Sequence, residues 1–159
     1  SVDDVTALLR AGADKVVIGT GGPRVISEIA AAIGNQAVVA ALDVKDGYAH
    51  VRCGKTRTEQ RAVAWARCCE AHGAGEILLT AMDREGTLGG YDQELVWEIA
   101  AAVSIPVIAN GGAGSYEHMR MAIMAGASGA AAGALFQFTD CTPRGAAEYL
   151  QARGVEVRL

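Results

Sequence analysis

The chain has 159 residues, 51% of them hydrophobic, which suits one domain with a sizeable core. Its net charge of −4 excludes the basic surface that nucleic-acid binding requires. Apolar runs recur along the whole length, which excludes a disordered chain, and none is long enough to span a membrane.

Amphipathic segments and short apolar runs alternate along the chain. We expect helices over residues 3–11, 24–33, 59–72, 92–102, 115–125 and 143–153. We expect strands at residues 15–18, 37–42, 76–81, 107–109 and 129–132, with residues 44–58 as a loop. The strands are continuous apolar runs, which is typical of a parallel sheet buried on both faces.

Strict alternation of helices and strands predicts an α/β fold with right-handed crossovers, as one domain over residues 1–159. Both a barrel and an open doubly wound sheet fit this pattern. A complete (β/α)8 TIM barrel has about 250 residues and eight strands. The five strands counted here therefore predict a partial TIM barrel without its first three βα units, whose open edges favour self-association.

Polar residues follow two of the strands. Asp43 comes directly after residues 37–42, at the end where barrel enzymes place their sites, so it is either a catalytic acid or a turn cap. Gly86 lies in the polar loop 83–87 after the next strand. That loop is either a phosphate contact or a charged surface loop.

Three glycine-rich turns also follow strands. Gly111 and Gly112 begin a turn that leads into a helix, a ready anion site, and Gly133 with Ala134 follow the last strand. Thr20 lies in a third turn, which would contact a second phosphate on the opposite side of the mouth.

Two nucleotide-binding motifs are incomplete in this sequence. Arg24 stands where a dinucleotide-binding fingerprint needs its third glycine, and Ala49 stands where a P-loop needs its first glycine. The four cysteines form no CxxC pair, so we expect no metal and reduced thiols in a cytoplasmic protein. The three histidines show neither ligand nor triad spacing.

Long motifs of the chain together resemble the cyclase subunit of imidazole glycerol phosphate synthase. The matching stretches are residues 12–16, 34–39, 73–80, 83–87, 90–92, 105–114, 148–150 and 157–159. The resemblance implies a (β/α)8 barrel that takes ammonia from a glutaminase partner. It implies cyclisation and lysis of a bis-phosphorylated ribulosyl-aminoimidazole carboxamide nucleotide by two aspartates, without metal or organic cofactor.

The resemblance also implies roles for single residues. Asp43 matches the second catalytic aspartate, whereas the first belongs to an opening strand that this sequence does not contain. Lys15 and Glu76 match the charged ring where ammonia enters, and Asp14 matches a position that faces the glutaminase. The matching phosphate-binding residues are Gly86, Gly112, Gly133 and Ala134 for one phosphate and Thr20 for the other.

Three hypotheses follow. The first is a cyclase in histidine biosynthesis whose isolated chain has little activity. The second is a non-catalytic, self-associating partial barrel, and the third is a phosphate-binding module. The sequence also departs from the pattern of the cyclase family, with Gly19 in place of the usual Asn and Glu85 in place of the usual Asp. A relative that amidates surface-polysaccharide sugars therefore remains an alternative.

Overall fold

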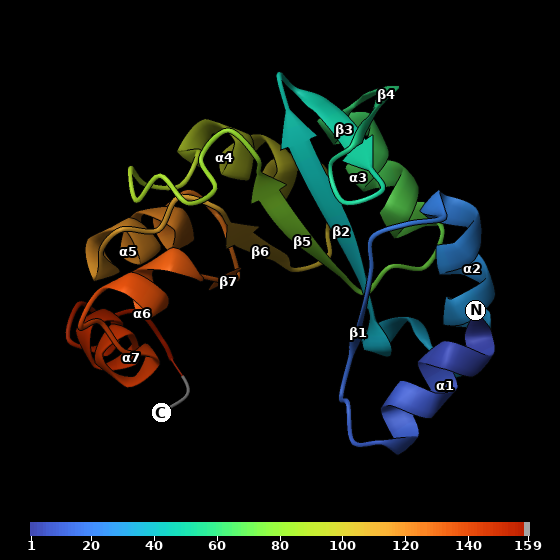
Figure 1. Cartoon of the computed structure of the whole chain (residues 1–159), viewed down its shortest axis with the longest axis horizontal. Helices are drawn as coiled ribbons and strands as arrows, with labels where there is room; N and C mark the ends of the chain where they lie inside the picture. The colour runs from blue at the N-terminus through green and yellow to red at the C-terminus, as the bar shows by residue number, and fades with distance from the viewer. Residues whose placement is uncertain (158–159) are drawn as a thin grey trace.

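The computed structural model describes residues 1–157, so Arg158 and Leu159 of the last matching stretch lie outside the described residues. Figure 1 shows a curved sheet with helices along its convex side. The elements are α1 (Val2–Arg10), β1 (Val16–Ile18), α2 (Gly22–Ile33), η1 (Asn35–Ala37), β2 (Val38–Lys45), β3 (Tyr48–Val51), β4 (Thr56–Arg61), α3 (Ala62–Ala71), β5 (Glu76–Ala81), α4 (Gln93–Ala102), β6 (Val107–Asn110), α5 (Tyr116–Met124), β7 (Gly129–Ala130), α6 (Ala134–Phe138) and α7 (Pro143–Gln151).

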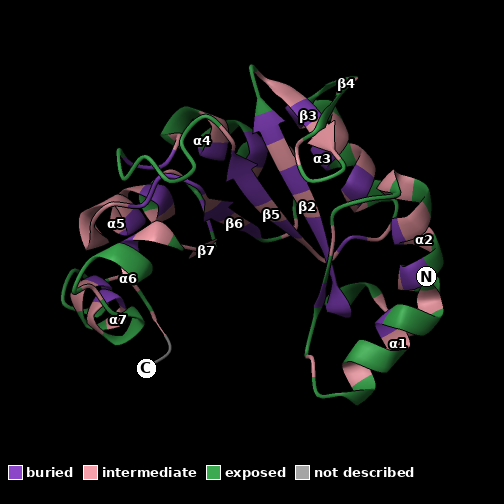
Figure 2. Ribbon diagram, in the orientation of Figure 1, coloured by how far each residue is buried: buried purple, intermediate pink, exposed green. Residues whose placement is uncertain are grey.

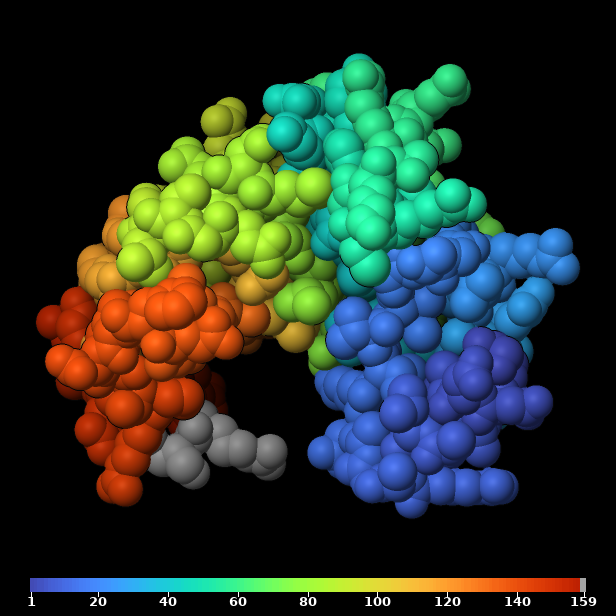
Figure 3. Space-filling model, viewed as in Figure 1, coloured from blue at the N-terminus to red at the C-terminus, as the bar shows by residue number. Residues whose placement is uncertain are grey.

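Five parallel strands make up the main sheet, in the order β1, β2, β5, β6, β7. This order follows the chain, without the reversal that a doubly wound sheet contains. The expected α/β fold with parallel strands is therefore confirmed. Within residues 1–157, β1 pairs only with β2 and β7 only with β6. The space-filling view shows the N-terminal and C-terminal parts at the two ends of the arc (Figure 3).

The expectation of a loop over residues 44–58 is wrong, because β3 and β4 form an antiparallel hairpin there. Asp46 and Gly47 connect β2 to β3 with φ angles of 51° and 74°. Positive φ at both central residues is the signature of a type I′ hairpin turn, which Asp-Gly favours. The hairpin also delays the next helix, so α3 begins at residue 62 rather than 59.

The last strand is shorter than expected. β7 contains two residues, and the chain leaves the strand before Ala131, although the Ala131 N–H still donates to the Ala109 carbonyl at 2.8 Å. The short helix α6 then begins at Ala134, one residue after Gly133. This early departure leaves a small-residue turn between β7 and α6.

Alternate residues of the central strands face two environments. One set is buried between sheet and helices and forms the core of the fold (Figure 2). Its strand members include Val38, Ala40, Leu42, Ile77, Leu79, Val107 and Ala109. Each large apolar side chain in this set contributes about 1.5–3 kcal/mol. The other set faces the concave side of the sheet and includes Asp43, Thr80 and Asn110, which are candidate site residues.

Candidate functional site

Three polar residues lie in one row at the carboxyl ends of the central strands. The strand register pairs Asp43 of β2 with Thr80 of β5, and Thr80 with Asn110 of β6. The Asn110 side-chain amide donates to the Thr80 hydroxyl at 3.1 Å. The Thr80 hydroxyl also interacts with Asp43 and lowers the pKa of its carboxyl group. The row therefore places three polar side chains next to one another on three neighbouring strands.

The environment of Asp43 favours its protonated form. Burial desolvates the half-buried carboxyl group and raises its pKa above the ordinary value of 3.8, whereas the Thr80 hydrogen bond and the charge of His50 lower it. His50 lies directly opposite Asp43 in the β2–β3 pairing. Desolvation is the largest of these causes, so the net shift is upward. A carboxyl group with a raised pKa is suited to proton transfer near neutral pH.

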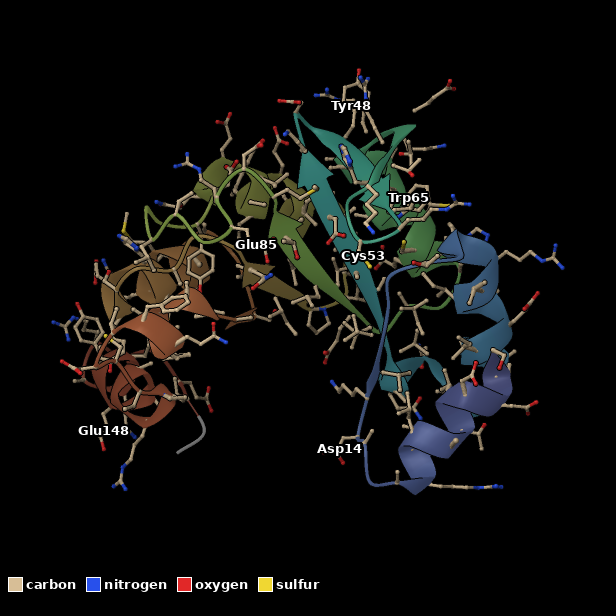
Figure 4. The ribbon with its side chains drawn as sticks, viewed as in Figure 1. Asp14, Tyr48, Cys53, Trp65, Glu85 and Glu148 are labelled. Atoms are coloured by element: carbon tan, nitrogen blue, oxygen red, sulfur yellow. The ribbon has the colours of Figure 1, made fainter. Side chains whose placement is uncertain are left out.

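A cavity of about 330 Å³ adjoins this row. It brings together five of the residues that the sequence predicted for phosphate binding: Gly86, Gly111, Gly112, Gly133 and Ala134. Asn110 also lines it, so the polar row and the cavity meet at one residue. Glu85, labelled in Figure 4, lies at the rim after β5.

The glycines of this cavity have two different roles. A Cβ on Gly111 would lie 2.7 Å from the Ala81 carbonyl oxygen, and one on Gly112 would lie 2.3 Å from that of Gly90. These two glycines allow close backbone packing, and their φ angles of 92° and 102° also favour glycine. Gly86 and Gly133 have no atom within 4 Å of such a Cβ, so any side chain there would enter open space beside the cavity.

Thr20 does not join this cavity. It is exposed after the end of β1, and β2 and β5 lie between β1 and the glycine-rich turn on β6. A contact of Thr20 with a second phosphate on the other side of the mouth stays a prediction.

The opposite end of the sheet carries the predicted charged pair. Lys15, just before β1, forms an ion pair with Glu76, the first residue of β5. The pair spans β2, because Glu76 lies beside Val39 in the register. Glu76 is largely buried, whereas Lys15 and the neighbouring Asp14 are exposed. Figure 4 shows Asp14 far from Tyr48 on the hairpin.

Sequence reasoning missed three residues of the site. Thr80 was hidden in an apolar strand, although its spacing of two and four residues from Leu78 and Glu76 places it on the same face. His50 was placed in a loop but lies on β3. His118 is close to the glycine-rich turn, and its Nδ1 accepts a hydrogen bond from the Gly114 N–H at 3.1 Å.

Residues 1–157 contain no group of three metal-ligating side chains, and Cys53, Cys68, Cys69 and Cys141 are free thiols. In the same residues, no helix is both long and apolar enough to cross a bilayer.

Comparison with known proteins identifies the family. The chain is 49% identical over 156 residues to the imidazole glycerol phosphate synthase subunit HisF of Chlorobium phaeobacteroides strain BS1, covering 93% of this chain and 62% of that protein. The HisF subunit of Chlorobaculum tepidum gives the same identity and coverage. That of Pyrobaculum aerophilum is 45% identical over 166 residues, covering 100% of this chain and 66% of that protein.

The chain thus spans 62–66% of the length of these curated relatives. A family model described as "Histidine biosynthesis protein" matches residues 1–142. This match covers every strand of the sheet. The chain belongs to the histidine biosynthesis protein family.

Proposed function

We propose that this chain forms part of the cyclase subunit of an imidazole glycerol phosphate synthase and provides one wall of a (β/α)8 TIM barrel. The proposed reaction adds ammonia to a bis-phosphorylated ribulosyl-aminoimidazole carboxamide nucleotide. It then closes the imidazole ring and releases imidazole glycerol phosphate and an aminoimidazole carboxamide nucleotide. The proposal rests on the row from Asp43 through Thr80 to Asn110, which leads into the glycine-lined cavity.

The spacing of the row supports a substrate of this size. Neighbouring strands lie about 4.8 Å apart, so Asp43 is separated from Asn110 by roughly 10 Å. A phosphate held beside Gly111 and Gly112 therefore leaves about 10 Å of substrate between its anchor and the carboxyl group. This is the scale of a phosphorylated sugar joined to a heterocycle.

Asp43 acts as a general acid or base in this proposal. It transfers a proton to or from the reacting atoms during ring closure, and the raised pKa supports this role because it lies closer to neutral pH than that of an ordinary carboxyl group. Thr80 orients the carboxyl group through its hydroxyl. The resemblance assigns the second acid–base aspartate to a strand outside the present sequence, so we propose that the chain alone turns over slowly. One member of such a pair contributes about 10²–10⁴-fold in rate.

The opposite end of the sheet is the proposed entrance for ammonia. Lys15 and Glu76 form a charged pair at the amino ends of the strands, away from Asp43. A glutaminase subunit docked at this end, over the exposed Asp14, would deliver ammonia along the concave side of the sheet toward the polar row.

Two substitutions separate binding from chemistry. Gly133→Val places a side chain beside the cavity, and we expect it to abolish binding of the bis-phosphorylated substrate in calorimetric titrations. Asp43→Asn should keep the substrate affinity within about threefold but lower turnover with ammonium salts by about 10²–10⁴-fold. Turnover is measured for the chain alone and with a polypeptide that supplies the first barrel strands of a relative.

Matched controls exclude general damage. Asp46→Asn changes an exposed carboxylate three residues further along, and Ala64→Val adds an apolar side chain on the exposed face of α3. Normal turnover by Asp43→Asn would overturn the cyclase proposal. Substrate binding without turnover in the completed barrel would favour the phosphate-binding module, and an amidated sugar as product would favour the amidating relative.

A further inference from the structure

His118 occupies the junction of two loops at the phosphate cavity. It lies in the first turn of α5, where its backbone N–H donates to the Ser115 hydroxyl at 3.2 Å. Its ring Nδ1 accepts the Gly114 N–H at 3.1 Å. The ring also lies against Gly90, since a Cβ on Gly90 would be 3.7 Å from it. His118 therefore contacts both the glycine-rich turn 111–114 and the loop 83–91.

These two loops pack backbone against backbone. The Gly90 N–H donates to the Gly112 carbonyl at 2.7 Å. A Cβ on Gly114 would lie 2.0 Å from the Leu88 carbonyl oxygen. Since the loop 83–91 carries Gly86 and the turn 111–114 carries Gly111 and Gly112, the junction sets the relative position of both halves of the cavity.

The hydrogen bond to Gly114 fixes the role of the ring nitrogen. A backbone N–H can only donate, so Nδ1 is the acceptor and directs its lone pair at the Gly114 N–H. A side chain without an acceptor at this place would leave the Gly114 N–H without this partner.

Several side chains surround the ring. Arg84, from the loop 83–91, lines the same 190 Å³ pocket as His118, together with Tyr91. Gln93 of α4 and Met121 of α5 also line it. The ring therefore lies among residues of the loop 83–91, α4 and α5.

We propose that His118 is a positioning residue for phosphate binding: its ring accepts the Gly114 hydrogen bond and so holds the turn 111–114 against the loop 83–91. This inference rests on the proposed function only in taking the cavity as an anion site. Loss of the acceptor atom should let the two halves of the cavity move apart and weaken anion binding. A side chain that keeps an acceptor at the same place should preserve it.

Sulfate is a suitable probe of the cavity. In calorimetric titrations of the full chain at one fixed pH, His118→Leu should bind sulfate about tenfold more weakly than the wild type. His118→Asn keeps an acceptor atom at the δ1 position, so it should bind sulfate within about threefold of the wild type. Circular dichroism verifies the fold of all three proteins. Unchanged sulfate affinity in His118→Leu, or an equal loss in both variants, would overturn the proposal.

A second readout separates this inference from the proposed function. The Gly114 amide resonance in ¹H–¹⁵N spectra should move in His118→Leu and stay near its wild-type position in His118→Asn. This pattern in a chain that binds no sulfate would support the positioning contact and overturn only the phosphate site. Sulfate binding with a Gly114 resonance that is unmoved in His118→Leu would refute the positioning role and leave the phosphate site standing.

Discussion

Replacing Gly112 by alanine should destabilise the fold, because the new Cβ meets backbone rather than open space. The Cβ would lie 2.3 Å from the Gly90 carbonyl oxygen, whereas contacts under 3.0 Å are essentially never seen, so the two loops must part by at least about 0.7 Å. The φ of 102° adds about 1–2 kcal/mol for a residue with a side chain. Overpacking adds a further 1–3 kcal/mol or so, which gives a total loss of about 3 kcal/mol.

Urea unfolding of Gly112→Ala measures this loss, and Gly133→Ala is the matched control. Gly133 has a φ of −107° and no atom within 4 Å of an added Cβ. We expect Gly133→Ala to change the free energy of unfolding by less than about 0.5 kcal/mol. Sulfate affinity should fall in both variants, for different reasons. A Gly112→Ala variant as stable as the wild type would refute the argument that this glycine serves backbone packing.

Three further predictions concern the polar row and its surroundings. Thr80→Val removes the hydrogen bond that lowers the pKa of Asp43, so that pKa should rise further in a ¹³C titration of the carboxyl carbon; an unchanged value would show that the bond is unimportant. Burial raises the pKa of Asp43 in the folded state, so its ionisation opposes folding above the unfolded value of 3.8. In urea unfolding, Asp43→Asn should therefore be more stable than the wild type at pH 8 and lose this advantage below about pH 3. Equal stability of the two proteins at pH 8 would contradict the raised pKa. Tyr91→Phe removes a 2.8 Å hydrogen bond to the Ala131 carbonyl beside the cavity. It should lower the free energy of unfolding by about 1–2 kcal/mol and weaken sulfate binding. If neither quantity changes, the bond does not support the cavity.

The parallel strands could be predicted because each is a short apolar run bounded by glycine or by a helix. The hairpin could not be predicted in the same way. β4 is a run of polar residues exposed on both faces, so it shows no alternation. It is held to β3 by main-chain pairing and by Arg57, whose guanidinium lies 3.8 Å from the centre of the Tyr48 ring. The Asp46-Gly47 turn was the one available signal.

A site residue could be predicted where an acidic residue or a run of glycines directly follows an apolar strand. Asp43 and the glycine-rich turns meet this condition. Thr80 and His118 do not, because their roles depend on register and on loop conformation. The i to i+4 separation of Gly114 and His118 allows many contacts, and only the packing of the turn against the loop 83–91 selects the one observed.

One edge of β2 is divided between two neighbours. β1 pairs with residues 38–40 and β3 with residues 43–45 of the same strand. Because both compete for a single row of main-chain donors and acceptors, a longer β1 would have to displace the hairpin. Insertions or deletions in the hairpin can therefore reshape the edge of the sheet next to Asp43. The pairing of β1 with residues 38–40, and with it the Lys15–Glu76 ion pair, would be retained.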